Sequence, residues 1–231
     1  MKNWFPDELI YAGEEHLDPD YVEGYDNKAQ TDPTEDVEIL RGLGMNETST
    51  VIDLGAGTGV VALALAPLCN RVIAVDVSDA MNANLSRAAA RDGIGNLEVV
   101  HGGFLSYQPD EAVDFVYSRN ALHHLSDFWK VIALQRIAAM LKSGGVLRLR
   151  DLVYSFPLEE TETKIDTWLA GGTATSDRGW TSEELATHVR TEFSTFNWLL
   201  EPMLERAGFE IRDVWHSPVG AYSAYTCVMV G

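Results

Sequence analysis

The sequence predicts an α/β fold: a doubly wound, mostly parallel sheet of seven strands, the last strand antiparallel, with a helical cap. Three observations lead to this prediction. Short β-branched and apolar segments alternate with helical segments from residue 50 onwards, a turn with three glycines joins the first strand to a helix, and a short link separates two strands near the C-terminus. Such alternation is typical of parallel sheets that carry helices on both faces.

The first five strands are short segments rich in apolar residues. They are expected at residues 50–54, 71–76, 96–101, 113–118 and 146–151. The helices expected between them span residues 59–68, 78–92 and 127–141. We expect Ser78 or Asp79 to cap the second helix and Ser143-Gly144-Gly145 to end the third, because short polar residues favour helix starts and glycine favours helix ends.

The regular alternation stops after Tyr154. Residues 155–195 are expected to form an aromatic-containing insertion, the helical cap. The elements expected from there on are helices at residues 182–193 and 198–207 and strands at residues 209–216 and 222–230. The link between the last two strands is so short that only an antiparallel pair can form. One strand near the edge of the sheet must therefore run in reverse.

Residues 1–48 are predicted to form an N-terminal arm and helix that cover the functional site, and residues 49–231 to form the main α/β domain. Prolines interrupt the polar arm, so we expect a short helix or two, followed by a helix from Thr34 to Gly42 or Gly44. The chain has 231 residues, 46% of them hydrophobic. That length and composition favour one large core over two small ones.

The composition favours a reduced, cytoplasmic protein. Cys69 and Cys227 are too few for a disulfide framework. The first 25 residues are acidic and lack the apolar segment of a secretory signal. The longest apolar run, residues 60–69, is about half of the roughly 20 residues that a membrane-spanning helix needs. We therefore expect no membrane association.

The charge distribution argues against a nucleic acid partner. The formal net charge is −18, and residues 1–50 contain 13 acidic side chains but only three basic ones, two Lys and one Arg. Such a field repels phosphate backbones, which nucleic acid-binding proteins attract with basic patches. A surface adapted to solubility or salt is the alternative explanation of the acidity. A small-molecule partner is expected, and a homodimer is left open.

The strongest motif is the turn that follows the first predicted strand. Glycine occupies every second position, Gly55, Gly57 and Gly59, and a helix begins immediately afterwards. Glycine lets a ligand approach the backbone, and a helix N-terminus offers unpaired N–H groups. Asp76 ends the next strand, where an acid can accept hydrogen bonds from ribose hydroxyls. A nicotinamide or flavin site is the competing reading, but Val60 occupies the position of its third glycine.

This combination resembles motif I of the class I S-adenosylmethionine (SAM)-dependent methyltransferases, in particular those that act on small molecules. The resemblance runs from about Val51 to Asp151 and implies a Rossmann-like methyltransferase fold, SAM as cofactor and S-adenosylhomocysteine as product. Asp53 is expected to hold the ammonium group of the cofactor, and Asp76 the ribose. The further cofactor contacts expected are Gly55, Ala56, Gly57, Val77, Gly103, Phe104 and Asn120, with Tyr25 and Lys28 from the arm. Gly103 stands where the family often has an adenine-binding Asp.

The segment Leu122-His123-His124-Leu125 follows the fourth strand and resembles a segment of small-molecule methyltransferases. His123 or His124 can act as a general base if the acceptor is a hydroxyl, or can cap a helix instead. Asp151, at the end of the fifth strand, is a second candidate base. No metal site is expected, because adjacent helical residues diverge by about 100° and the sequence shows no third ligand.

Two alternatives to a small-molecule methyltransferase remain open. A tRNA methyltransferase is suggested by the Arg150-Asp151 ending of the fifth strand, although the net charge disfavours it. A non-catalytic partner subunit that holds SAM or S-adenosylhomocysteine is the other. Methyl transfer depends mainly on alignment and exclusion of water, so the sequence need not contain a sharp catalytic motif.

Overall fold

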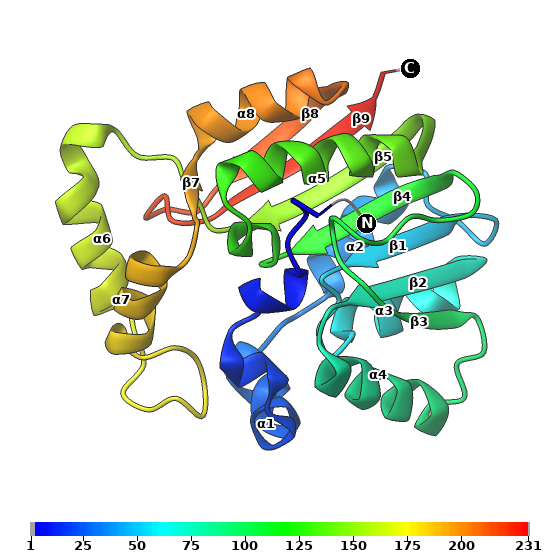
Figure 1. Ribbon diagram of the computed structural model, residues 1–231, viewed down its shortest axis with the longest axis horizontal. Helices are drawn as coiled ribbons and strands as arrows, with labels where there is room; N and C mark the ends of the chain where they lie inside the picture. The colour runs from blue at the N-terminus through cyan, green and yellow to red at the C-terminus, as the bar shows by residue number, and fades with distance from the viewer. Residues whose placement is uncertain (1–2, 231) are drawn as a thin grey trace.

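A computed structural model describes residues 3–230 and contains a seven-stranded sheet in the order β3-β2-β1-β4-β5-β9-β8 (Figure 1). The strands are β1 (Thr50–Leu54), β2 (Arg71–Asp76), β3 (Leu97–His101), β4 (Val113–Arg119), β5 (Leu141–Asp151), β8 (Phe209–His216) and β9 (Ser223–Met229). The first five are parallel, and β9 runs antiparallel to both β5 and β8. The predicted fold class, including the reversed last strand, is confirmed.

Helices cover both faces of the sheet and form two apolar clusters with it. One face carries α2 (Thr34–Gly42), α3 (Val60–Leu65) and α4 (Asp79–Arg91), and the other carries α5 (Asp127–Met140) and α8 (Asn197–Arg206). A short 3₁₀ helix, η3 (Ala66–Leu68), follows α3. Burying apolar side chains on both faces explains why the strands are short, continuous apolar runs.

The predicted end of α5 is met within one residue, but the predicted glycine stop was wrong. The helix ends at Met140, and β5 begins at Leu141, which pairs with Val113. The pairing of β4 with β5 shifts between Val113 and Phe115. The glycines expected to end the helix lie inside β5: Gly144 has φ +77°, and a Cβ on Gly145 would lie 3.2 Å from the carbonyl oxygen of Asp114. These glycines allow the irregular backbone at the start of β5 and do not cap a helix.

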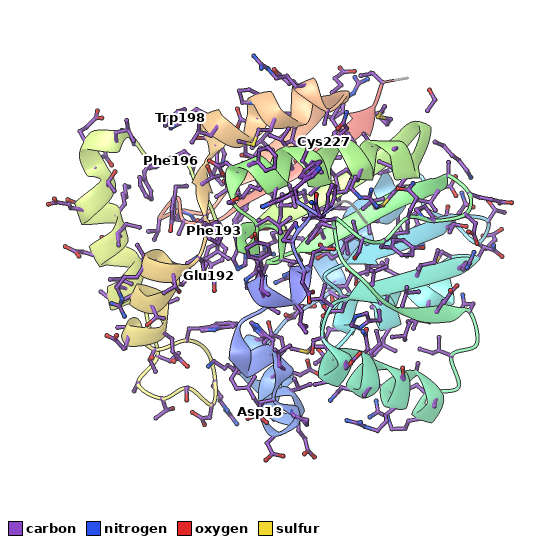
Figure 2. All side chains as sticks on the ribbon, in the orientation of Figure 1. Asp18, Glu192, Phe193, Phe196, Trp198 and Cys227 are labelled. Atoms are coloured by element: carbon purple, nitrogen blue, oxygen red, sulfur yellow. The ribbon has the colours of Figure 1, made fainter. Side chains whose placement is uncertain are left out.

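The N-terminal arm and the cap lie beyond the carboxyl ends of the parallel strands (Figure 1). The arm contains η1 (Glu8–Tyr11), η2 (Glu14–Leu17) and α1 (Pro19–Ala29). The cap contains η5 (Leu158–Glu160), α6 (Thr161–Ala170), α7 (Ser182–Thr191) and a two-stranded parallel sheet of β6 (Val153–Tyr154) and β7 (Thr195–Phe196). Phe196 and the half-exposed Trp198 stack where the cap joins α8 (Figure 2). No helix within residues 3–230 has the length and apolarity to cross a membrane.

Asp36 and Lys28 attach two N-terminal helices to the sheet and to the cap. Asp36 of α2 is buried and accepts hydrogen bonds from Tyr117 Oη (2.7 Å) and Arg148 Nε (3.3 Å), both from the centre of the sheet. Lys28 Nζ of α1 lies 2.5 Å from Glu184 Oε1 of α7 and joins the arm to the cap. A buried charge requires such a partner. The division of the chain at residue 48 stays a prediction.

The glycine turn after β1 has backbone angles that few other residues adopt. Gly55, Gly57 and Gly59 have φ of +73°, +56° and +81°. A Cβ on Gly55 would overlap the Cβ of Ala121, whereas a Cβ on Gly57 would meet no atom within 4 Å. The backbones of β1 and of the segment after β4 therefore approach closely at Gly55 and leave open space at Gly57.

The two glycines should respond differently to a methyl group. Gly55→Ala adds overlap to the left-handed backbone penalty, so we expect the free energy of unfolding to fall by about 2–4 kcal/mol. Gly57→Ala carries the backbone penalty alone, about 1 kcal/mol. Urea unfolding of both variants without cofactor measures the difference. Equal losses would show that the close approach at Gly55 does not matter.

Candidate active site

Two adjoining cavities lie at the carboxyl ends of β1, β2 and β4. The first is bounded by the glycine turn, the end of β2, the segment after β3 and the arm. The second is bounded by the arm, by η4 (Leu122–His124) and by α7 and the residues that follow it. The residues that line both are Tyr11, Ala12, His16, Tyr25, Asn120, His124 and Trp180. These shared residues mark a junction between the cavities.

Asp76 connects the end of β2 to the glycine turn. Its Oδ2 accepts a hydrogen bond from Gly57 N at 2.8 Å, and its Oδ1 accepts one from Ser78 N at 2.8 Å. Burial raises the pKa of Asp76, and these two donors oppose the shift. Each carboxylate oxygen can accept a second hydrogen bond, so the group can still bind hydroxyls in the cavity.

Asp53 is buried on the floor of the first cavity. Burial, with the nearby Asp76 carboxylate, raises the pKa of Asp53 to about 7. Tyr25 also lines this cavity, and burial raises its pKa to about 12, so its hydroxyl stays protonated at neutral pH. A cationic ligand would stabilise the ionised form of Asp53 and lower its pKa.

The structure places nearly all the predicted cofactor residues around the first cavity. They are Tyr25, Asp53, Gly55, Ala56, Gly57, Asp76, Val77, Gly103, Phe104 and Asn120. Lys28 lies instead at the second cavity, where its ammonium pairs with Glu184 and faces the rings of Tyr21 (5.2 Å) and Trp180 (5.8 Å). Asn120 has φ +51°, a left-handed conformation that asparagine adopts more readily than most other residue types.

Glu8 is a cavity residue that the sequence prediction missed. Its carboxylate accepts hydrogen bonds from Leu105 N (2.8 Å) and Ser106 Oγ (2.6 Å) and lines the first cavity. A Cβ on Gly103 would lie 2.5 Å from Glu8 Oε2. The arm thus brings a carboxylate to the place beside Gly103 that an acidic side chain at position 103 would occupy. Only tertiary packing reveals this, because Glu8 is 95 residues from Gly103 in the sequence.

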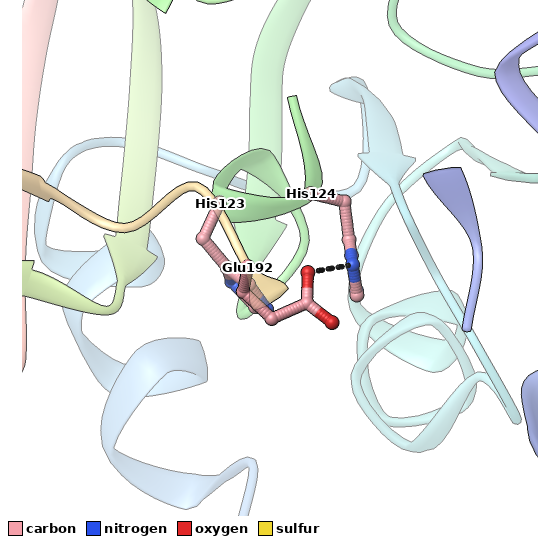
Figure 3. A group of neighbouring side chains, drawn as sticks. All are labelled: His123, His124 and Glu192. Atoms are coloured by element: carbon pink, nitrogen blue, oxygen red, sulfur yellow. Dashed lines mark hydrogen bonds and ion pairs between the residues drawn. The ribbon is translucent and has the colours of Figure 1, made fainter. Parts of the chain in front are cut away.

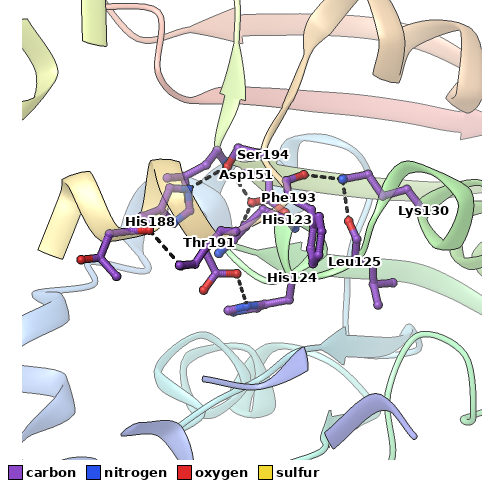
Figure 4. Close-up of polar contacts among 12 residues, drawn as sticks. His123, His124, Leu125, Lys130, Asp151, His188, Thr191, Phe193 and Ser194 are labelled. Atoms are coloured by element: carbon purple, nitrogen blue, oxygen red, sulfur yellow. Dashed lines mark hydrogen bonds and ion pairs between the residues drawn. The ribbon is translucent and has the colours of Figure 1, made fainter. Parts of the chain in front are cut away.

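The three predicted catalytic residues lie together at the second cavity (Figure 4). His123 Nδ1 lies 2.5 Å from Asp151 Oδ1, and His123 N donates to Asp151 Oδ2 at 3.1 Å. Burial lowers the pKa of His123. Burial alone would raise the pKa of Asp151, but the contacts with His123 and the Leu152 N–H outweigh it and hold that pKa below its usual value. His123 lines the second cavity, whereas Asp151 lies behind it.

His124 makes a second pair with a carboxylate. Its Nδ1 lies 3.0 Å from Glu192 Oε2, at the end of α7. Two more imidazoles surround the pair: the His188 ring lies 5.0 Å from that of His123, and the His16 ring 5.8 Å from that of His124. Burial, with His123 nearby, lowers the pKa of His188 to about 4. Of the two predicted histidines, His124 is the one at the junction of the cavities.

Comparison with known proteins finds similarity to proteins named as methyltransferases. A family model described as "Methyltransferase domain" matches residues 51–145. An uncharacterized methyltransferase of Bacillus cereus is 24% identical over 197 residues, 85% of this chain and 86% of the relative. The uncharacterized methyltransferase YcgJ of Bacillus subtilis is 36% identical over 102 residues, 44% of this chain and 40% of the relative.

Solved structures give the same answer for the fold. A SAM-dependent methyltransferase from Aquifex aeolicus superposes with a TM-score of 0.64 at 22% identity, covering 92% of this chain and 99% of that one. The chain therefore has the fold of SAM-dependent methyltransferases, and its residues 51–145 match a methyltransferase domain. The matched residues 51–145 contain the glycine turn, Asp76 and the histidine pair, whereas the arm and the cap lie outside the matched domain.

The buried Asp53 predicts a pH dependence of SAM binding. With a pKa of about 7, Asp53 is mostly protonated below that pH in the unliganded protein. The cationic cofactor favours the ionised form, so binding releases a proton and affinity should rise by up to about tenfold per pH unit between pH 5.5 and 7. Calorimetry in two buffers of different ionisation enthalpy measures both effects. Asp53→Asn should flatten the profile; a variant with the wild-type slope would exclude Asp53 as its source.

Proposed function

We propose that this methyltransferase binds SAM in the first cavity and transfers its methyl group to a small-molecule acceptor held in the second, in the cytoplasm. The observation that carries the proposal is the junction: His124, Tyr25 and Asn120 border both cavities. A cofactor in one cavity and an acceptor in the other therefore meet where displacement at the methyl carbon requires them.

The first cavity matches the chemistry of SAM along its length. We place the amino-acid end of the cofactor on the glycine turn, with its ammonium toward Asp53. Asp76 then lies beside the ribose, and Val77 and Phe104 flank the adenine. Glu8 accepts a hydrogen bond from the adenine amino group, in place of the acid that position 103 lacks. The sulfonium methyl is left at the junction, and the arm side chains Tyr11 and Tyr25 help to exclude water there.

The transfer breaks the bond between sulfur and the methyl carbon, and the acceptor's lone pair forms the new bond. The electron pair of the broken bond stays on sulfur, which gives neutral S-adenosylhomocysteine. A hydroxyl or amine acceptor must also lose a proton. His123 and His124 line this wall of the second cavity with Asp151 behind His123, and of the two histidines only His124 also lines the first cavity.

The second cavity favours a small acceptor over a nucleic acid. Its lining includes Glu183, Glu184 and Glu192, and Lys28 is already paired with Glu184. A tRNA would need unpaired basic groups beside the methyl donor. Retention on heparin or a footprint on tRNA would support that alternative. The two buried thiols, Cys69 and Cys227, are consistent with a reducing compartment.

Asp76 should be required for cofactor binding. We expect Asp76→Ala to weaken SAM affinity at least about tenfold in calorimetry, because the variant loses charge-assisted hydrogen bonds to the ribose and the anchor of Gly57 N. Asp79→Ala removes an exposed acid three residues away and serves as the control, with SAM affinity unchanged. Unaltered affinity in Asp76→Ala would remove Asp76 from the site.

Catalysis is tested by methyl release over a panel of hydroxyl, amine and carboxyl metabolites, with His124→Ala as the site variant. The wild-type chain should methylate at least one class, and His124→Ala should reduce kcat on it by roughly a hundredfold while SAM affinity stays within about twofold. If the wild-type chain binds SAM tightly but is inactive on every metabolite, it is a cofactor-holding partner subunit instead.

A further inference from the structure

The second cavity contains a set of side chains whose chemistry suits a metal ion. His123, His124 and Glu192 each offer one ligand atom, and the three atoms lie within 4.8 Å of one another (Figure 3). The histidines come from η4 and the glutamate follows α7, 68 residues beyond His124. The sequence alone does not reveal this third ligand, because only the packing of the cap brings Glu192 next to the histidine pair.

The neighbouring histidines do not point apart as two adjacent residues of an α-helix would. They lie in a single 3₁₀ turn, with ring centroids 4.3 Å apart and ring planes inclined by 36°. His124 Nδ1 and Glu192 Oε2 are 3.0 Å apart, a separation that two ligands of one ion also adopt. Bonds of about 2.1 Å require ligand atoms about 3.4 Å apart in a tetrahedral site. A pair of ligand atoms at the 4.8 Å limit must therefore approach by about 1.4 Å, which side-chain rotation can supply.

His123 has the support that metal-binding histidines usually have. Its Nδ1 is bonded to Asp151 Oδ1 at 2.5 Å, and Asp151 is fixed in turn by the N–H groups of His123 and Leu152. A buried carboxylate on one ring nitrogen fixes the tautomer and leaves the lone pair of Nε2 for an ion. Asp151 would be a positioning residue in this arrangement, acting through His123.

We propose that His123, His124 and Glu192 bind a divalent transition metal ion such as Zn²⁺ beside the junction of the two cavities. Two imidazoles and one carboxylate suit Zn²⁺, Co²⁺ or Fe²⁺ and are too nitrogen-rich for Mg²⁺. Three protein ligands leave a fourth position, which an acceptor oxygen takes. This inference rests on the proposed function and narrows the acceptor to one with a hydroxyl or carboxyl oxygen, held on the ion as the oxyanion.

In this proposal His123 and His124 are metal ligands and do not remove the acceptor's proton themselves. An ion lowers the pKa of a bound hydroxyl, whose proton then passes to solvent or a nearby base, and the oxyanion attacks the methyl carbon. His123 and His124 act as ligands, and loss of either releases the ion.

The test uses untagged, full-length protein freed of metal with a chelator. Zn²⁺ calorimetry should give one site per chain, and Co²⁺ should give the visible absorption of a low-coordinate nitrogen and oxygen site. Mg²⁺ should give no heat. We expect His124→Gln and Glu192→Gln to weaken Zn²⁺ binding roughly tenfold or more. His101→Gln is the matched control: it also removes an imidazole next to a carboxylate, that of Asp79, and should bind Zn²⁺ like the wild type.

Unfolding temperature and SAM affinity are measured for every variant, so that a misfolded protein is not mistaken for a lost site. Absence of a Zn²⁺ site in the wild type, or a site that both glutamine variants retain, overturns the metal proposal. Full methyl transfer by chelator-treated protein overturns it too and leaves the proposed function intact. Failure to bind SAM would count against the proposed function, whatever the result with Zn²⁺.

Discussion

The site depends on one constraint, the left-handed backbone of the turn between β1 and α3. Three glycines at alternate positions let the chain reverse direction within a few residues and leave open space at Gly57. The Asp76 carboxylate holds this turn by accepting from Gly57 N, so the groups expected to bind the two ends of the nucleoside are themselves bonded to each other. The ends of the neighbouring strands and the arm then close around the space that the turn creates.

Much of the sheet could be predicted from the sequence, because burial on both faces makes its strands short apolar runs. β1, β2 and β8 have the expected bounds. The cap was harder to predict. α6 was not expected, and β6 and β7 are two-residue strands that form only because distant segments meet. The Gly144-Gly145 pair was misread because a glycine stop looks the same in sequence whether it ends a helix or opens a strand.

The cofactor half of the site was more predictable than the acceptor half for the same physical reason. A glycine turn and a strand-ending acid are local patterns, and the fold fixes where they lie. Glu8 and Glu192 reach the cavities through the packing of the arm and the cap, which leaves no periodic signal in the chain. Lys28 illustrates the limit: its place in the arm was recognised, but its ammonium turns away to Glu184.

The contact between Lys28 and Glu184 has a consequence for ligand traffic. The segment around η1, η2 and α1 walls both cavities, and this ion pair fastens it to α7. Movement of this segment away from α7 would therefore break the ion pair and widen both cavities together. Ligand exchange in such an arrangement depends on how readily the arm separates from the cap.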